Sequence, residues 1–111
     1  MSRVRLDRAL VLEVPLRVAD GAGGFAEGWQ AVGTIWAEVR PGVGRMVGAM
    51  EAAAVTLPLR ITVRGLPQEN ALRPKAGHRF RDGARLFLIN AVTERDGMGR
   101  YLLCAAEEVF G

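Results

Sequence analysis

Hydrophobic and polar residues alternate along most of this chain, and this period of two predicts β-strands. The first such segment, residues 10–18, has its large apolar side chains on one face: Leu10, Leu12, Val14, Leu16 and Val18. Polar residues and Pro15 occupy the other face. Because Pro15 has no N–H group to donate to a ladder, we expect its face to lie at an edge or a bulge.

A second, longer strand is predicted after a short glycine-rich segment. Its apolar residues share one parity: Phe25, Trp29, Ala31, Ile35, Ala37 and Val39. We expect the strand to be most regular from Trp29 to Val39, with Phe25 and Trp29 in the core. Trp36 has the opposite parity, so the pattern leaves its position open.

The glycine-rich segment Asp20–Gly24, with the sequence DGAGG, lies between these two strands. A Walker loop requires GxxxxGK[ST] followed by a helix, and a dinucleotide fingerprint requires GxGxxG at the start of a helix. No lysine follows here, and the next element is a strand. We therefore predict a hairpin turn, for which glycine supplies the positive φ angles.

Residues 40–56 have a different pattern, in which apolar side chains recur at helical spacing: Val43, Met46, Val47, Met50 and Ala54. Gly44 and Gly48 each weaken such a helix by ~1 kcal/mol relative to alanine. The segment is predicted to be a long connection with one short, marginal helix. Its methionines either cap the barrel or, as adaptable side chains, pack on a partner.

The rest of the chain alternates again. Strands are predicted at 56–64, at about 72–81, at 85–92, which is apolar on both parities and therefore central, and at 101–110. Asp82-Gly83 is a hairpin signal between two of them. The sequence thus predicts an all-β fold of six mainly antiparallel strands, a small barrel or sandwich, as a single domain over residues 1–111.

Composition agrees with one globular domain. The chain has 111 residues, of which 50% are hydrophobic and 24% are charged. No apolar run approaches the ~20 residues that span a bilayer, and the charged N-terminus does not resemble a signal peptide. Arginine supplies almost all of the positive charge. The net charge of +3 is too small to indicate nucleic-acid binding by itself.

Candidate catalytic residues are few. His78 is the single histidine, and a lone histidine in a strand is more often structural than catalytic. Cys104 is the single cysteine, so it forms no intrachain disulfide, and its apolar neighbours favour an inert core thiol in a protein made in a reducing cytoplasm. Glu107 and Glu108 point to opposite faces of a strand. We expect no enzyme, no cofactor and no metal site.

The order of short motifs resembles the phage head–tail joining family, also called head-completion, stopper or head–tail connector proteins. The most specific motifs are Asp20 with Gly23-Gly24, Trp36-Ala37 through Gly44-Arg45, Ile61-Thr62-Val63-Arg64, and Leu88-Ile89-Asn90. The resemblance covers about residues 6–110. None of these motifs is catalytic, so the similarity rests on their order and spacing.

The resemblance implies a small β-barrel that forms a homo-oligomeric ring, a dodecamer or hexamer, between the portal or adaptor and the tail terminator or tail tube. The ring would extend or close the DNA channel without sequence-specific DNA binding and without a membrane. It implies assembly in the bacterial cytoplasm and a place in a phage, prophage or gene transfer agent particle.

The resemblance also implies that the loop after the second strand is the joining or stopper element. Its candidate interface residues are Arg40, Val43, Arg45, Met46, Val47, Met50 and Glu51. Many family members have a glutamate where this chain has Met46, and Glu51 is the nearest acid in the segment. A subunit salt bridge made by that glutamate would therefore differ here.

Four outward arginines are candidates for the wall of a DNA channel: Arg60, Arg64, Arg79 and Arg81. A solvated face or a subunit contact is the alternative role for them. Two other functions remain open. A nucleic-acid-binding barrel would use Phe25, Trp29 or Trp36 for stacking, and a tail terminator would also form a ring of small subunits.

Overall fold

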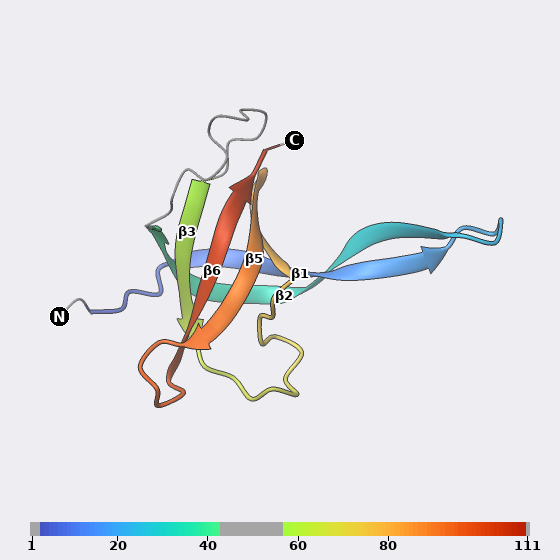
Figure 1. Cartoon of the computed structure of the whole chain (residues 1–111). Coiled ribbons are helices and arrows are strands. Elements are labelled where there is room, and N and C mark those ends of the chain that lie inside the picture. The colour runs from blue at the N-terminus through green and yellow to red at the C-terminus, as the bar shows by residue number, and fades with distance from the viewer. Residues whose placement is uncertain (1–2, 43–56, 111) are drawn as a thin grey trace.

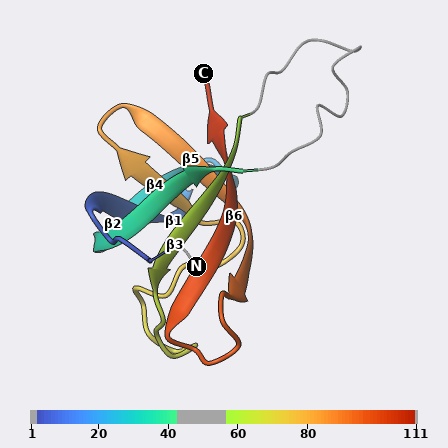
Figure 2. The same ribbon diagram turned by 90° about the vertical axis from the view of Figure 1, so that its left-hand side faces the viewer.

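The computed structural model describes residues 3–42 and 57–110, in which six β-strands form one antiparallel sheet. The strands are β1 (Arg8–Ala19), β2 (Phe25–Pro41), β3 (Leu57–Arg64), β4 (Arg79–Asp82), β5 (Arg85–Glu94) and β6 (Tyr101–Val109). The order β1-β2-β3-β6-β5-β4 closes into a barrel (Figure 1, Figure 2). The all-β antiparallel fold predicted from the sequence is therefore confirmed.

The predicted helix lies almost wholly in residues 43–56, which are outside the described residues. β2 continues through Pro41, which pairs with Leu59 of β3. Arg40 therefore belongs to a strand and not to the connection that the sequence predicted for it. Within the described ranges, no residue is helical.

The core fills the barrel with side chains from all six strands. They are the residues that strand alternation turns inward: Leu10, Leu12, Ile35, Ala37, Ile61, Val63, Phe80, Phe87, Ile89, Leu102, Cys104 and Ala106. Phe80 and Phe87 face each other across β4 and β5 and are fully buried. Burying a large apolar side chain contributes roughly 1.5–3 kcal/mol, so this interior is the main stabilising element of the chain.

The fourth strand is much shorter than predicted. The sequence predicts a strand from about Leu72 to Arg81, whereas β4 comprises only Arg79–Asp82. Turns occupy the preceding residues, since the N–H of Arg73 donates to the carbonyl of Asn70 and that of His78 donates to Lys75. Pro74 cannot donate to a ladder, and it is fully buried in this connection.

Two aromatic residues that the sequence placed in the core are exposed instead, because they lie beyond a β-bulge and beyond the part of β2 that pairs with β3. Leu12 pairs with Gly33 and Glu13 pairs with Ala31, so Val32 is an extra residue in β2. One extra residue reverses which parity faces inward. Ile35 and Ala37 stay in the core, but Phe25 is 60% exposed and Trp29 is 37% exposed.

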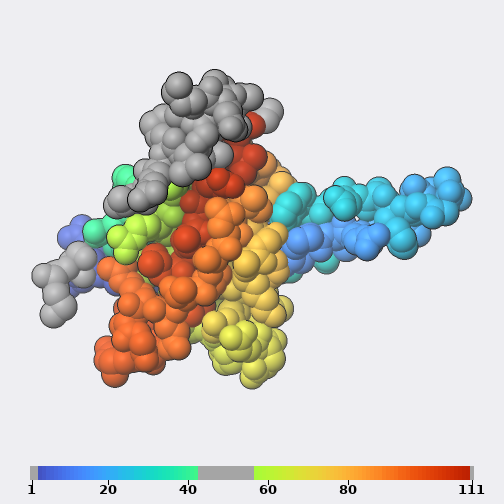
Figure 3. Space-filling view, viewed as in Figure 1, coloured from blue at the N-terminus to red at the C-terminus, as the bar shows by residue number. Residues whose placement is uncertain are grey.

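Beyond the bulge, the β1–β2 hairpin leaves the barrel as a two-stranded ribbon, which we call the arm (residues 14–31). β1 pairs with β4 only over Val11–Glu13, and β2 pairs with β3 only from Ala37 onward. The arm therefore has no third strand, and it extends well away from the body (Figure 1, Figure 3). Pro15 lies at an edge of this ribbon, as we expected for a residue without an N–H group.

The predicted glycine turn closes the tip of the arm. Asp20 accepts hydrogen bonds from the N–H groups of Ala22 and Gly24, at 2.8 and 3.1 Å from the same carboxylate oxygen. Gly21 and Gly23 have φ angles of 79° and 86°, which residues other than glycine rarely adopt. The DGAGG segment is thus a hairpin turn, as expected, and not a phosphate loop.

Candidate functional site

The described residues contain no cluster of three or more His, Cys, Asp or Glu side chains that could hold a metal ion. Burial raises the pKa of the Cys104 thiol to about 12, so the thiol stays protonated at neutral pH. Burial also lowers the pKa of His78, with a smaller effect from Lys75. Across the described ranges no helix has the length and apolar composition needed to cross a bilayer.

An ionic cluster holds the base of the arm. Glu13 accepts hydrogen bonds from Arg79 Nε at 2.6 Å and from Arg81 Nε at 2.9 Å. Burial alone would raise the pKa of Glu13, but the hydrogen bonds and charges of Arg81 and Arg79 lower it below its usual value. Glu13 is therefore a buried carboxylate with two cationic partners.

Arg79 links this cluster to the arm itself. Its guanidinium carbon lies 4.1 Å from the centroid of the Trp29 ring, which is a cation–π distance. Glu13 of β1, Arg79 of β4 and Trp29 of β2 thus meet where the arm leaves the barrel. The sequence does not reveal this cluster, because Glu13 and Arg79 are 66 residues apart.

The two faces of the arm differ in chemistry. One face carries Trp29 and Phe25, with the Arg17 guanidinium 4.4 Å above the Phe25 ring. The other face is aliphatic, because Leu16 pairs with Gly28 and Val18 pairs with Ala26. Leu16 and Val18 are both exposed. A ribbon with apolar residues on both faces and no core of its own is typical of an interaction element.

A hollow of about 200 Å³ lies on the arm, lined by Pro15, Leu16, Arg17, Glu27, Gly28 and Trp29. A Cβ atom built on Gly28 would have nothing within 4 Å, so this residue is open to the surface. The hollow is open at the surface and is mainly apolar, with the charged groups of Arg17 and Glu27 in its wall.

A second ionic cluster covers the outer face of β2 and β3. Glu38 is buried and accepts hydrogen bonds from the backbone N–H of Arg5 at 2.9 Å and from Arg40 and Arg95 at 3.4 Å. Arg95 also donates to Thr62 Oγ1 at 2.8 Å. Arg40, which we predicted to be an interface residue of the loop, is in fact partly engaged with Glu38 on the barrel.

The four predicted channel arginines do not form one surface. Arg60 and Arg64 are exposed on β3, whereas Arg79 and Arg81 lie on β4 and bind Glu13. In the order β1-β2-β3-β6-β5-β4, β3 and β4 lie on opposite sides of the barrel. Trp36, the aromatic residue left open by the sequence pattern, is 58% exposed on the outer face beside β3. The remaining loop candidates, Val43, Arg45, Met46, Val47, Met50 and Glu51, lie outside the described residues.

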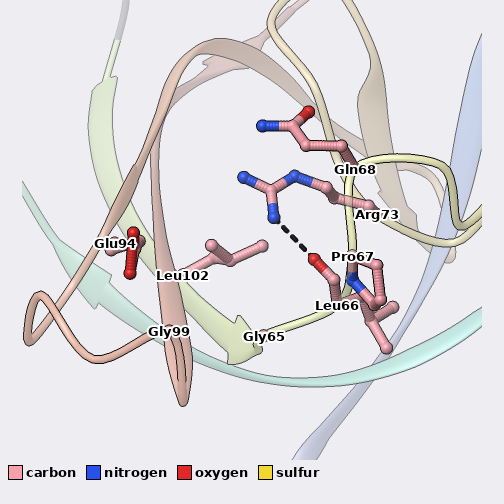
Figure 4. Close-up of a pocket in the computed structure, with 8 residues that line it drawn as sticks. All are labelled: Gly65, Leu66, Pro67, Gln68, Arg73, Glu94, Gly99 and Leu102. Carbon is pink, nitrogen blue, oxygen red and sulfur yellow. Dashed lines mark hydrogen bonds between the residues drawn. The ribbon is translucent and has the colours of Figure 1, made fainter.

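A cleft of about 460 Å³ opens between the connection after β3 and the β5–β6 turn (Figure 4). Arg73 donates to the carbonyl of Leu66 on one side, and Glu94 lies on the other side beyond Leu102. The described residues that line it include no His, Cys or Ser, so they offer no nucleophile with a neighbouring base.

Comparison with known proteins places this geometry in context. A model of the family described as phage head completion protein matches residues 1–109. A chain in the virion of a native gene transfer agent particle is 48% identical, with a TM-score of 0.80 over 97% of this chain and 98% of that one. The solution structure of protein SF1141 from Shigella flexneri 2a is 20% identical, with a TM-score of 0.66 over 96% of each chain, and shares the fold. No curated protein matches the chain.

Proposed function

Because this chain belongs to the phage head completion protein family, we propose that it is a structural protein of the head–tail connector in a phage-like particle. The observation that carries this proposal is the 48% identical chain, which is part of a gene transfer agent virion and covers almost the same length. The role is one of assembly and not of catalysis. A gene transfer agent is the particle type that this similarity favours over an infectious phage.

The finer proposal is a ring of identical subunits between the portal or adaptor and the tail. A small closed barrel with a projecting arm supports this arrangement, because such a subunit can contact both neighbours through different surfaces. The axis of the ring would continue the DNA channel. The same particle protein would be made and assembled in the bacterial cytoplasm.

Arg60 and Arg64 are our candidates for the channel wall. Both are exposed on β3, and no ion pair between described residues includes either of them. Contacts of arginine with phosphate are independent of sequence and weaken with salt. Replacing both by glutamine should weaken low-salt binding of duplex DNA equally for all sequences, whereas Arg100→Gln at the β5–β6 turn should leave it unchanged. A marked sequence preference would favour the nucleic-acid-binding barrel instead.

The connection at 43–56 is our candidate for the joining element. Met46→Asp should leave the melting temperature of the isolated protein unchanged but should prevent tails from joining heads, if the segment contacts a partner. A large fall in melting temperature would show that Met46 packs on its own barrel. Normal numbers of tailed, DNA-filled particles would remove the segment from the mechanism.

Deletion of the gene in the producing cell tests the function as a whole. Electron microscopy should show filled or leaking heads and separate tails, and supplying the wild-type chain from a plasmid should restore tailed particles. Mass spectrometry of purified wild-type particles should find the chain as a component. Tailed particles in the deletion strain, or particles that lack the chain, would contradict the proposal.

A further inference from the structure

The outer edge of β2 is unpaired along the arm (Figure 1). β2 pairs with β1 from Phe25 to Ala37, but it pairs with β3 only from Ala37 onward. In an antiparallel pair, alternate residues direct their N–H and C=O groups away from the partner strand. We propose that residues 25–31 of β2, which we call the arm edge, bind an extended apolar segment of a different protein in the particle as an added β-strand.

The arm edge lacks the features that normally prevent strand addition. Exposed edges are usually blunted by proline, by lysine and other charges, or by a bulge. The arm edge contains no proline, lysine or arginine, and its single charged residue is Glu27. The bulge at Val32 lies just after it. At 3.3 Å per residue the arm edge is about 23 Å long, which is the length of an ordinary strand. An extended peptide recognises such an edge through main-chain hydrogen bonds.

The aromatic face of the arm limits the chemistry of the added segment. Phe25 and Trp29 are 60% and 37% exposed on this face. Their rings are held by the guanidinium groups of Arg17 and Arg79, at 4.4 and 4.1 Å. Arg17 lies opposite Glu27 in the ladder, so the two charges within the arm offset each other. A segment beside this face therefore meets aromatic surface and requires no charge of its own.

The aliphatic face of the arm favours large apolar side chains in the added segment. On this face β2 contributes small residues, since Ala26 pairs with Val18 and Gly28 pairs with Leu16. A Cβ atom built on Gly28 would have nothing within 4 Å. Side chains of an added strand can therefore lie over Ala26 and Gly28 without a clash. There they would cover apolar surface next to Leu16 and Val18, which are otherwise exposed.

The topology argues against a second copy of this chain as the occupant. Within the described residues, the longest other unpaired edges are residues 14–19 of β1, which Pro15 interrupts, and the short end of β5 after Ile89. Two copies that paired through their arm edges would use the same surface on both, and such an isologous contact ends at a dimer and builds no ring. This inference rests on the proposed function for the presence of other proteins in the particle.

Photo-crosslinking in assembled particles tests the proposal. The photoreactive residue p-benzoylphenylalanine would replace either Ala26 or Gln30 in a chain that complements the deletion strain. Both residues are exposed and lie on the same face of the arm edge, four residues apart. Because paired strands advance together by about 3.3 Å per residue, the two adducts should map to one segment of one other protein, at sites about four residues apart. The same photoreactive residue at Met98, which is exposed at the β5–β6 turn, should give no adduct with that segment.

Three outcomes would overturn strand addition while leaving the function intact: no adduct in particles that contain the chain, adducts with a second copy, or adducts from the two positions that map to unrelated segments. Absence of the chain from purified particles would instead contradict the proposed function.

Amide hydrogen exchange of the unmodified chain is a second test. Only the N–H groups that face β1 are bonded in the free protein, so the number of slowly exchanging amides in residues 25–31 should about double in particles. An unchanged number would also overturn the proposal.

Discussion

Replacement of Glu13 by glutamine tests whether the base of the arm is held by charge. The substitution keeps the shape and one acceptor oxygen but removes the negative charge from between Arg79 and Arg81. The Glu13 side chain is only 9% exposed, compared with 16% for Arg79 and 41% for Arg81. The loss in the free energy of unfolding should therefore come mainly from the Arg79 contact. Arg81 is more exposed, so water can replace Glu13 as its hydrogen-bond partner.

The magnitude follows from these exposures. A hydrogen bond to a charged group contributes about 1.5–3 kcal/mol, which we assign to the buried Arg79 contact. The Arg81 contact resembles a surface ion pair and contributes at most about 1 kcal/mol. Glu13→Gln should thus lower the free energy of unfolding by about 1.5–4 kcal/mol at pH 7. With a urea m-value of about 2 kcal/mol per molar, the unfolding midpoint should fall by roughly 0.75–2 M.

The assay is urea unfolding at a series of pH values, with Glu69→Gln in the exposed turn as the matched control. Because the folded-state pKa of Glu13 is lowered, its contribution is complete above the usual pKa of 4.5 and is lost as the pH falls through the folded-state value. The difference between wild type and Glu13→Gln should therefore shrink below about pH 4.5. A cost at pH 7 equal to that of Glu69→Gln, or a difference that persists unchanged at low pH, would refute the reasoning.

Other substitutions test the packing of the barrel. Gly65→Ala should destabilise the fold by at least about 2 kcal/mol in the same urea assay, because its Cβ would lie 1.9 Å from the carbonyl oxygen of Gly99. Arg85→Lys should cost less than about 1 kcal/mol by urea unfolding, since the two 2.8 Å bonds to Glu108 lie at a half-exposed arginine. Cys104 should react with a thiol reagent only in the unfolded protein, as its burial and raised pKa require; rapid reaction in native buffer would contradict this.

Alternation predicted the strands well because most of them face a common core. β1, β3, β5 and β6 begin and end within two residues of the predicted ranges. The pattern could not show where the core ends. Val14, Leu16 and Val18 continue the apolar parity of Leu12 along β1, yet the barrel stops near Glu13 and the same parity passes into solvent.

The errors have local physical causes. Val32 is one extra residue whose effect on parity cannot be read from a hydrophobic pattern, since valine fits either face of a strand. The predicted strand start at Leu72 was wrong, because the chain forms turns around Pro74. The alternation of apolar and polar residues in this segment was weak. The ionic cluster of Glu13 with Arg79 and Arg81 joins segments more than 60 residues apart, and only the closure of β1 onto β4 brings them together.

The order of the arm before assembly decides how much binding energy a partner must supply to hold it. Fixing the backbone of a disordered residue costs about 1–2 kcal/mol, whereas burying one large apolar side chain contributes only roughly 1.5–3 kcal/mol. An arm that had to order on binding would therefore lose more free energy than one buried side chain could supply. A two-stranded ribbon alone is marginal in water, but this one continues the barrel strands, is closed at its tip by Asp20, and rests at its base on Trp29 beneath Arg79. It follows that Glu13→Gln, which loosens the base of the arm, should impair both stability and particle assembly.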